Sequence, residues 1–260
     1  MASGQEIRSK IGSVKNTQKI TKAMEMVAAS KLRRTQERME AARPYAERIR
    51  TVIGHLSEAN PDDGHPFLEK REVMRERYIV IRTDRGLCGS LNVNMFRAVL
   101  NDLSQWQSKD IEADLCLIGA KGAAYFRRLK VNIVAATTHL GEDPKVADLV
   151  GAITAMTDAY EEGKIDQLFL VHNVFVNTMS QQPVIKALLP VEVTDSEALQ
   201  EHWDYLYEPS AGELLQTVVA RYLESQVYRG AVENVACEMA SKMVAMKAAT
   251  ENAGKFIDQL

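Results

Sequence analysis

The sequence predicts an α/β protein in which long N-terminal and C-terminal helices form an antiparallel coiled coil that carries an inserted α/β domain. Three observations predict this: a basic first segment with helical periodicity, a middle part that alternates strand and helix patterns, and a last segment with apolar residues at steps of three and four. Residues 1–50 hold 12 Lys and Arg and 5 acidic residues, a net +7, although the whole chain carries −3. Because dense like charges repel one another, this segment is expected to face an acidic partner.

The first helix is expected over residues 1–58. Its apolar stripe is thin and slips in phase between Val14 and Ile20, which is typical of a shaft that contacts different neighbours along its length. Pro44 should kink or restart the helix, because proline removes a backbone donor and clashes with the preceding turn. The Pro- and Gly-containing stretch 60–66 predicts a loop.

The middle part, residues 75–190, alternates strand and helix patterns, which predicts a Rossmann-like, mostly parallel sheet with one antiparallel strand at its end. Asp143 is expected to cap a helix that begins at Pro144 and stops at Gly163. The expected strands are 78–82, 115–118, 131–135, 168–176 and 184–189, and the other expected helices are 93–107 and 121–129.

The last helix is expected over residues 208–260, with a coiled-coil register that runs from Val232 to the final residue. Its expected seam residues are Val232, Val235, Met239, Met243, Met246, Thr250, Ala253, Ile257 and Leu260. A long helix with so thin a stripe gains its stability from packing, so the two terminal helices are expected to wind around each other.

The motif that most resembles an enzyme site is the glycine-containing turn 83–92, with Asp84, Arg85, Gly86 and Gly89, between the first strand and the next helix. Nucleotide-binding folds place their phosphate loop at this position. The spacing of the glycines matches neither the dinucleotide fingerprint nor the P-loop, so a tight structural turn is the favoured interpretation. A Rossmann-like nucleotide-binding enzyme with a helical appendage stays open as the alternative.

Other functional classes are weakly supported by the composition. A coiled-coil adaptor for nucleic acid is disfavoured because the basic segment has few aromatic residues and the whole chain is acidic, with a pI near 6.0. The 3 cysteines and 5 histidines are scattered, so neither a disulfide nor a metal site is expected. No run of residues is apolar enough to predict a membrane span, and no secretory signal is expected.

Three motifs in order along the chain resemble the γ subunit of bacterial F-type ATP synthases. They are the run 16–31, the turn 83–92 and the stretch from Glu233 through 243–253. The resemblance implies a non-catalytic central stalk, which binds no nucleotide or other cofactor and couples rotation of the membrane c ring to changes at the catalytic β subunits. It also implies α, β, ε and c-ring partners and a peripheral position on the cytoplasmic face of the bacterial inner membrane.

The resemblance also assigns contacts to particular residues. The positions expected to meet the β subunits are Met24, Lys31, Arg33, Arg34, Lys242 and Met246, and those expected to meet the c ring or the ε subunit are Tyr205, Tyr207 and Glu208. The basic charge of residues 1–50 would then face acidic loops of the β subunits. A simpler interpretation is that most of these charges only solvate the helix, each contributing about 0–1 kcal/mol.

Overall fold

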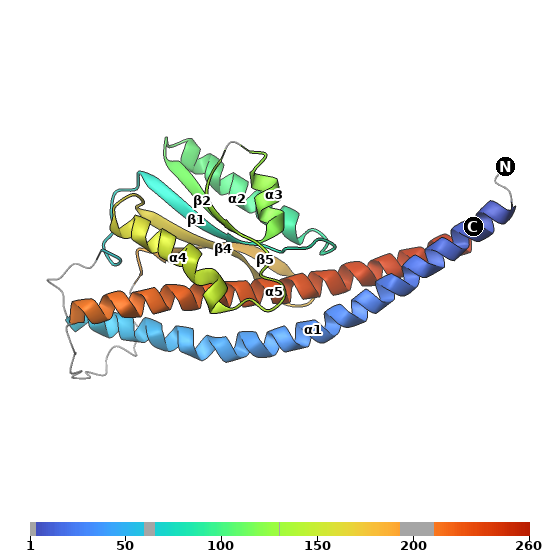
Figure 1. Ribbon diagram of the computed structural model, residues 1–260, viewed down its shortest axis with the longest axis horizontal. Coiled ribbons are helices and arrows are strands. Elements are labelled where there is room, and N and C mark those ends of the chain that lie inside the picture. The colour runs from blue at the N-terminus through green and yellow to red at the C-terminus, as the bar shows by residue number, and fades with distance from the viewer. Residues whose placement is uncertain (1–3, 60–65, 130, 193–210) are drawn as a thin grey trace.

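The computed structural model describes residues 4–59, 66–129, 131–192 and 211–260. Two long helices form a rod, and a five-stranded sheet domain between them in sequence lies along one side of it (Figure 1). The elements in order are α1 (Gly4–Ala59), β1 (Arg75–Ile81), α2 (Leu91–Gln107), β2 (Glu112–Ile118), α3 (Ala120–Phe126), β3 (Asn132–Thr137), α4 (Val146–Glu161), β4 (Gln167–Phe175), β5 (Gln181–Leu189) and α5 (Ala211–Gln259).

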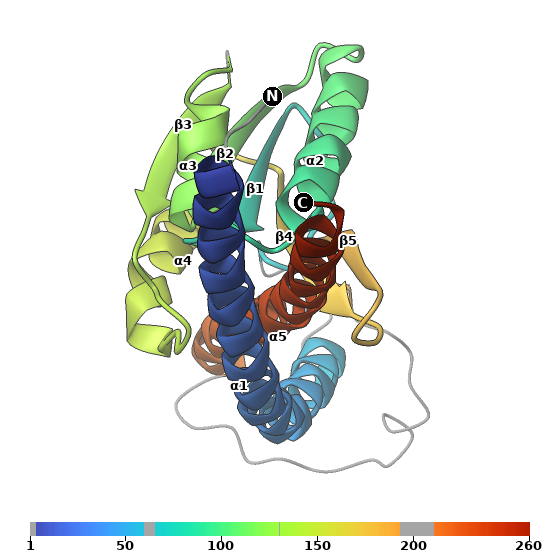
Figure 2. The same cartoon turned by 90° about the vertical axis from the view of Figure 1, so that its right-hand side faces the viewer.

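Helices α1 and α5 run antiparallel, which confirms the predicted coiled coil. Thr21 Oγ1 lies 2.7 Å from Thr250 Oγ1, while farther along α1 Leu32 packs against the earlier α5 residues Ala236 and Met239. Figure 2 shows the two helices crossing each other with the sheet domain on one side of the rod. The sheet domain therefore folds back along the rod instead of extending it.

The predicted phase slip in α1 is wrong. Ile20 and Val27 are 59% and 53% exposed, whereas Thr21, Ala28 and Thr35 are buried at a regular seven-residue spacing. Small and polar side chains continue the seam where the apolar stripe appeared to drift. A stripe drawn through apolar residues alone is therefore one position out of register at these points.

Pro44 does not restart the helix, because α1 runs without a break from Gly4 to Ala59. The proline is exposed, and the helix is curved along its length (Figure 1). Beyond it, Ile53 and Leu56 are almost fully buried in the same core cluster as the sheet and α5. This packing holds the second part of α1 in place despite the lost backbone donor.

The sheet has the strand order β3-β2-β1-β4-β5, with the first four strands parallel and β5 antiparallel to β4, as the sequence predicts. Alternate residues of β1 point to opposite faces. Tyr78 and Val80 pack with α2 and α3, and Ile79 and Ile81 pack with α4 and α5. Helix α5 thus has two roles: it forms one half of the two-helix rod, and it covers one face of the sheet.

Several predicted boundaries shift by two or three residues: β2 begins at Glu112, β5 begins at Gln181 and α3 ends at Phe126, and the starts of β1 and α4 move as well. β1 begins at Arg75 and not at residue 78, because its charged residues find buried partners: Arg77 Nε donates to Asp114 Oδ2 at 2.9 Å. Helix α4 begins at Val146 and not at Pro144.

The later start of α4 has a visible cause. Asp143 accepts a hydrogen bond from Arg38 of α1 at 2.7 Å, and the Asp148 carboxylate accepts the backbone N–H of Lys145 at 3.2 Å. Asp143 therefore pairs with α1 instead of capping α4. Asp148 accepts the otherwise unpaired backbone donor at the start of α4. The predicted stop at Gly163 is confirmed, with φ of +68° at that glycine.

Candidate functional site

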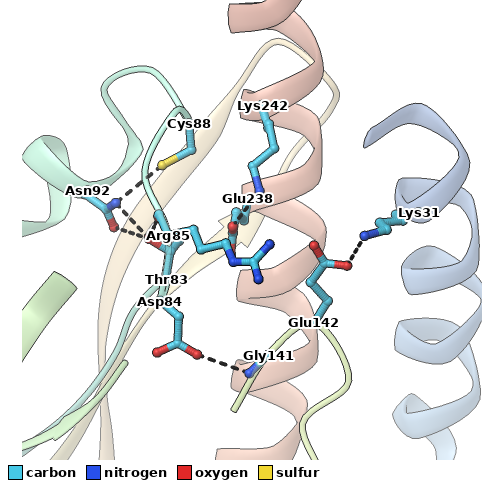
Figure 3. Close-up of polar contacts among 10 residues, drawn as sticks. All are labelled: Lys31, Thr83, Asp84, Arg85, Cys88, Asn92, Gly141, Glu142, Glu238 and Lys242. Carbon is cyan, nitrogen blue, oxygen red and sulfur yellow. Dashed lines mark hydrogen bonds and ion pairs between the residues drawn. The ribbon is translucent and has the colours of Figure 1, made fainter. Parts of the chain in front are cut away.

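The turn 83–92 leaves the carboxyl end of β1 and is held by its own side chains (Figure 3). Asn92 Nδ2 donates to Thr83 Oγ1 at 2.8 Å, and Thr83 Oγ1 donates to the carbonyl of Arg85 at 2.7 Å. Gly89 has φ of +56°, a left-handed backbone conformation that glycine adopts without strain. Gly86 does not have a positive φ. These contacts agree with the favoured interpretation of a structural turn.

The Asp84 carboxylate accepts hydrogen bonds from three backbone N–H groups. The donors are those of Ala120 at 2.9 Å, His139 at 3.1 Å and Gly141 at 3.1 Å. These donors lie at the carboxyl ends of the parallel strands, where related folds bind phosphate. Because the chain's own carboxylate already takes them, the turn is poorly suited to bind a nucleotide phosphate.

A crevice of about 440 Å³ lies between this turn, the segment after β3 and the two long helices. Lys31 of α1 pairs with Glu142, and Glu238 of α5 accepts a hydrogen bond from Lys242 Nζ at 2.9 Å (Figure 3). Burial raises the pKa of Glu238, and the neighbouring Lys242 opposes that rise. The Lys31–Glu142 pair therefore links α1 to the sheet domain across the crevice.

The structure places the predicted β-subunit contacts in two environments. Arg33 and Arg34 are exposed on α1, where Arg33 Nε lies 3.5 Å from Glu37 Oε1. Met24 and Lys31 are half-buried, and Lys31 faces Glu142 of the sheet domain. Arg33 and Arg34 are therefore more accessible to another chain than Met24 and Lys31 are.

Two further predicted contacts lie inside the chain. Lys242 and Met246 are 9% and 5% exposed on α5. Their assignment to the β-subunit contact stays a prediction, as does that of the four α1 residues. Tyr205, Tyr207 and Glu208 lie outside the described residues.

Sequence reasoning missed three exposed apolar residues on the rod. Ile20, Met26 and Val27 of α1 are each more than half exposed and lie off the seam with α5. Drawing the heptad through Thr21 and Ala28 would have revealed them, because the neighbouring positions then fall on the outer face. Ile20 and Val27 are seven positions apart and share one face of α1, whereas Met26 lies about 100° around the helix from Val27.

The described residues contain no helix long and apolar enough to cross a membrane. Within the same ranges, no group of three or more His, Cys, Asp or Glu side chains could hold a metal ion.

Comparison with known proteins identifies the class. The family model for ATP synthase matches residues 3–260. The ATP synthase gamma chain of Nitrosococcus oceani is 55% identical over 263 residues, covering 100% of this chain and 91% of that protein. The chain therefore belongs to the ATP synthase family, and the predicted resemblance to bacterial γ subunits is confirmed.

Solved structures show the same fold at lower identity. The central stalk and c-ring structure of Tetrahymena thermophila mitochondrial ATP synthase contains a chain with a TM-score of 0.66 and 22% identity, covering 88% of this chain and 99% of that one. A rotor chain of Euglena gracilis mitochondrial ATP synthase has a TM-score of 0.62 and 16% identity, covering 97% and 92%. Family and fold together support the role of a central rotary shaft and do not favour a nucleotide-binding enzyme.

Proposed function

We propose that this chain is the non-catalytic central shaft of an F-type ATP synthase. In this role it couples rotation of a membrane c ring to conformational change at catalytic β subunits. Its partners are the α and β subunits around the rod and the ε subunit and c ring beside the sheet domain. The assembly then sits peripherally on the cytoplasmic face of the bacterial inner membrane. The observation that carries the proposal is a stiff two-helix rod with one sheet domain attached to one side.

The mechanism follows from symmetry. A single rod with unlike faces cannot contact three equivalent β subunits in the same way, so each subunit meets a different surface. Moving a site between 1% and 99% occupancy of a state requires about 5.5 kcal/mol of differential contact energy. Turning the rod transfers this bias from one subunit to the next.

The two kinds of surface on α1 suit this role. Ile20, Met26 and Val27 present exposed apolar side chains on α1, which suit contact with a surrounding subunit. Arg33 and Arg34 add positive charge on the same helix, which acidic loops of a surrounding subunit would attract. Catalysis would then lie in the β subunits, in agreement with the Asp84 carboxylate taking backbone donors at the carboxyl ends of the strands.

Reconstitution with purified α and β subunits tests the proposal. The chain should restore cooperative ATPase activity, and Arg33→Gln/Arg34→Gln should reduce it several-fold. Lys121→Gln/Arg127→Gln removes the same charge from an exposed position of α3 and from the exposed residue just after it, and serves as the matched control. Tight binding of ATP or NAD by the isolated chain, with no effect on α and β, would favour the enzyme alternative.

A further inference from the structure

A groove of about 300 Å³ lies between α5 and the hairpin formed by β4 and β5. Three elements supply its polar lining: His172 of β4, Lys186 of β5, and Gln226, Arg229 and Glu233 of α5. This hairpin groove is separate from the crevice beside the turn 83–92, with which it shares no lining residue.

The hairpin groove holds two cations, Lys186 and Arg229, against one acid, Glu233. Lys186 Nζ donates to the neutral amide oxygen of Gln226 at 2.8 Å, and no ion pair joins Arg229 to an acid within the described ranges. Burial lowers the pKa of Lys186, and the charges of Arg229 and Arg50 lower it further. Neighbouring cations that repel one another in a half-buried groove are stabilised when an anion enters between them.

The one acid of the groove is already engaged. Glu233 Oε2 lies 3.5 Å from His172 Nε2, and Glu233 Oε1 accepts the backbone N–H of Phe175 at 3.2 Å. Burial alone would raise the pKa of Glu233, but the contacts with His172 and Phe175 and the charge of Arg229 hold it below its usual value. The carboxylate is therefore ionised and faces the imidazole.

His172 supplies a second, independent sign that something is missing from the groove. The residue is only 7% exposed, and its buried Nδ1 has no hydrogen-bond partner among the described residues. A buried polar atom without a hydrogen-bond partner is rare in folded proteins, so a group that reaches this nitrogen would be favoured. The formal charges of Lys186, Arg229 and Glu233 still leave the groove net positive, because two cations stand against one acid.

We propose that the hairpin groove binds one anionic oxygen group, a carboxylate or a phosphate, with Lys186 and Arg229 as its cationic contacts. Two sources share this chemistry: free inorganic phosphate, and an acidic side chain of a neighbouring subunit. The second source rests on the proposed function, since it requires the chain to assemble into the ATP synthase. The first does not.

The first experiment titrates the full-length chain with inorganic phosphate at constant ionic strength and follows the His172 ring signal by NMR. That signal is assigned by its loss in His172→Gln. Lys186→Gln/Arg229→Gln should weaken any saturable shift at least tenfold, while the control Lys121→Gln/Arg127→Gln should leave it unchanged. Should the groove double variant lose its fold, Arg229→Gln alone makes the same test at a half-buried position.

The second experiment assembles the chain with α, β and ε subunits and compares the same variants. A saturable phosphate shift in the isolated chain supports the free anion. No phosphate shift, but a His172 shift on assembly and about tenfold weaker assembly of the groove variant alone, supports a partner carboxylate. If the groove and control variants behave alike in both experiments, the proposal is overturned. Failure to restore ATPase activity would instead count against the proposed function, because the phosphate titration needs no partner.

Discussion

The two ends of α5 are parts of one helix in very different surroundings. Every residue from 231 to 240 is buried between α1 and the sheet, whereas none from 251 to 260 is. Within the first stretch, Asn234 Oδ1 accepts a hydrogen bond from Asn173 Nδ2 at 2.9 Å. Just before the second stretch, Thr250 Oγ1 lies 2.7 Å from Thr21 Oγ1 of α1. Helical periodicity alone thus does not separate an element of a domain core from an element of a rod.

The two regions should differ in how strongly a substitution changes the free energy of unfolding. Tight packing makes the sheet-covered region sensitive to small changes, because a filled interior cannot absorb an added or lost group without strain. The rod beyond it has solvent on most sides, so the same changes there should be tolerated. Matched substitutions in the two regions test this difference.

The largest contrast is expected between two glycines. Gly119 has φ of +108°, and a Cβ there would lie 2.4 Å from the carbonyl oxygen of Arg82, so Gly119→Ala should cost about 3 kcal/mol or more. Gly12 lies in the rod with nothing within 4 Å of a new Cβ, so Gly12→Ala should stabilise the helix by about 0.5–1 kcal/mol. Urea unfolding measures the free energy of unfolding of both variants. Similar changes in the two would contradict the expected difference between the sheet-covered region and the rod.

A pH effect is expected in the sheet domain. Glu76 is fully buried, and burial raises its pKa from 4.5 to about 7, against the hydrogen bond from Tyr78 and helped by the charge of Asp102. The folded state then binds this proton more tightly than the unfolded state does. Stability should therefore fall as the pH rises from about 4.5 to about 7, by up to about 1.4 kcal/mol per pH unit, and level off above.

Glu76→Gln should remove that slope and make the protein more stable than wild type at pH 8. The exposed Glu112→Gln, which also removes a carboxylate near the start of a strand, should keep the wild-type profile. Chemical denaturation at a series of pH values from 4 to 8 is the measurement. An unchanged slope in Glu76→Gln would show that this carboxyl group is not its source.

A smaller contrast is expected between two asparagines of α5. Asn234→Ala leaves the amide of the buried Asn173 without its partner, which should cost about 2 kcal/mol. Asn252→Ala, at an exposed position of the same helix, should change stability by less than about 0.5 kcal/mol. Thermal unfolding of the two variants side by side measures the difference, and equal losses would contradict it.

The smallest effect is expected inside the rod. Thr250→Val removes the hydroxyl contact with Thr21 but keeps the shape of the side chain, so it should cost about 0.5–1 kcal/mol. Thr17→Val, on the exposed face of α1, should cost less. Hydrogen exchange at the free end of the rod would report the loss locally, and a loss at the sheet instead would show that the two regions are not independent.

Much of the candidate site could be predicted from the sequence because its signals are local. The glycine spacing of the turn 83–92 excludes known phosphate loops, and the structure shows Asp84 taking the available donors. The pairing of Lys31 with Glu142 was not predictable, because 111 positions separate the two residues. Nor was the hairpin groove, whose cations Lys186 and Arg229 come from different elements.

The sequence by itself determined the elements of this protein: the alternation of strands and helices, the stop at Gly163, and the seam of α5 through Met246 and Thr250. These depend on backbone conformation and on the period of neighbouring side chains. Only the tertiary structure decided which face each element buries. The seam of α1 runs through Thr21 and Ala28 and leaves Ile20 and Val27 exposed. Burial depends on what packs against a residue, and that is a property of the whole chain.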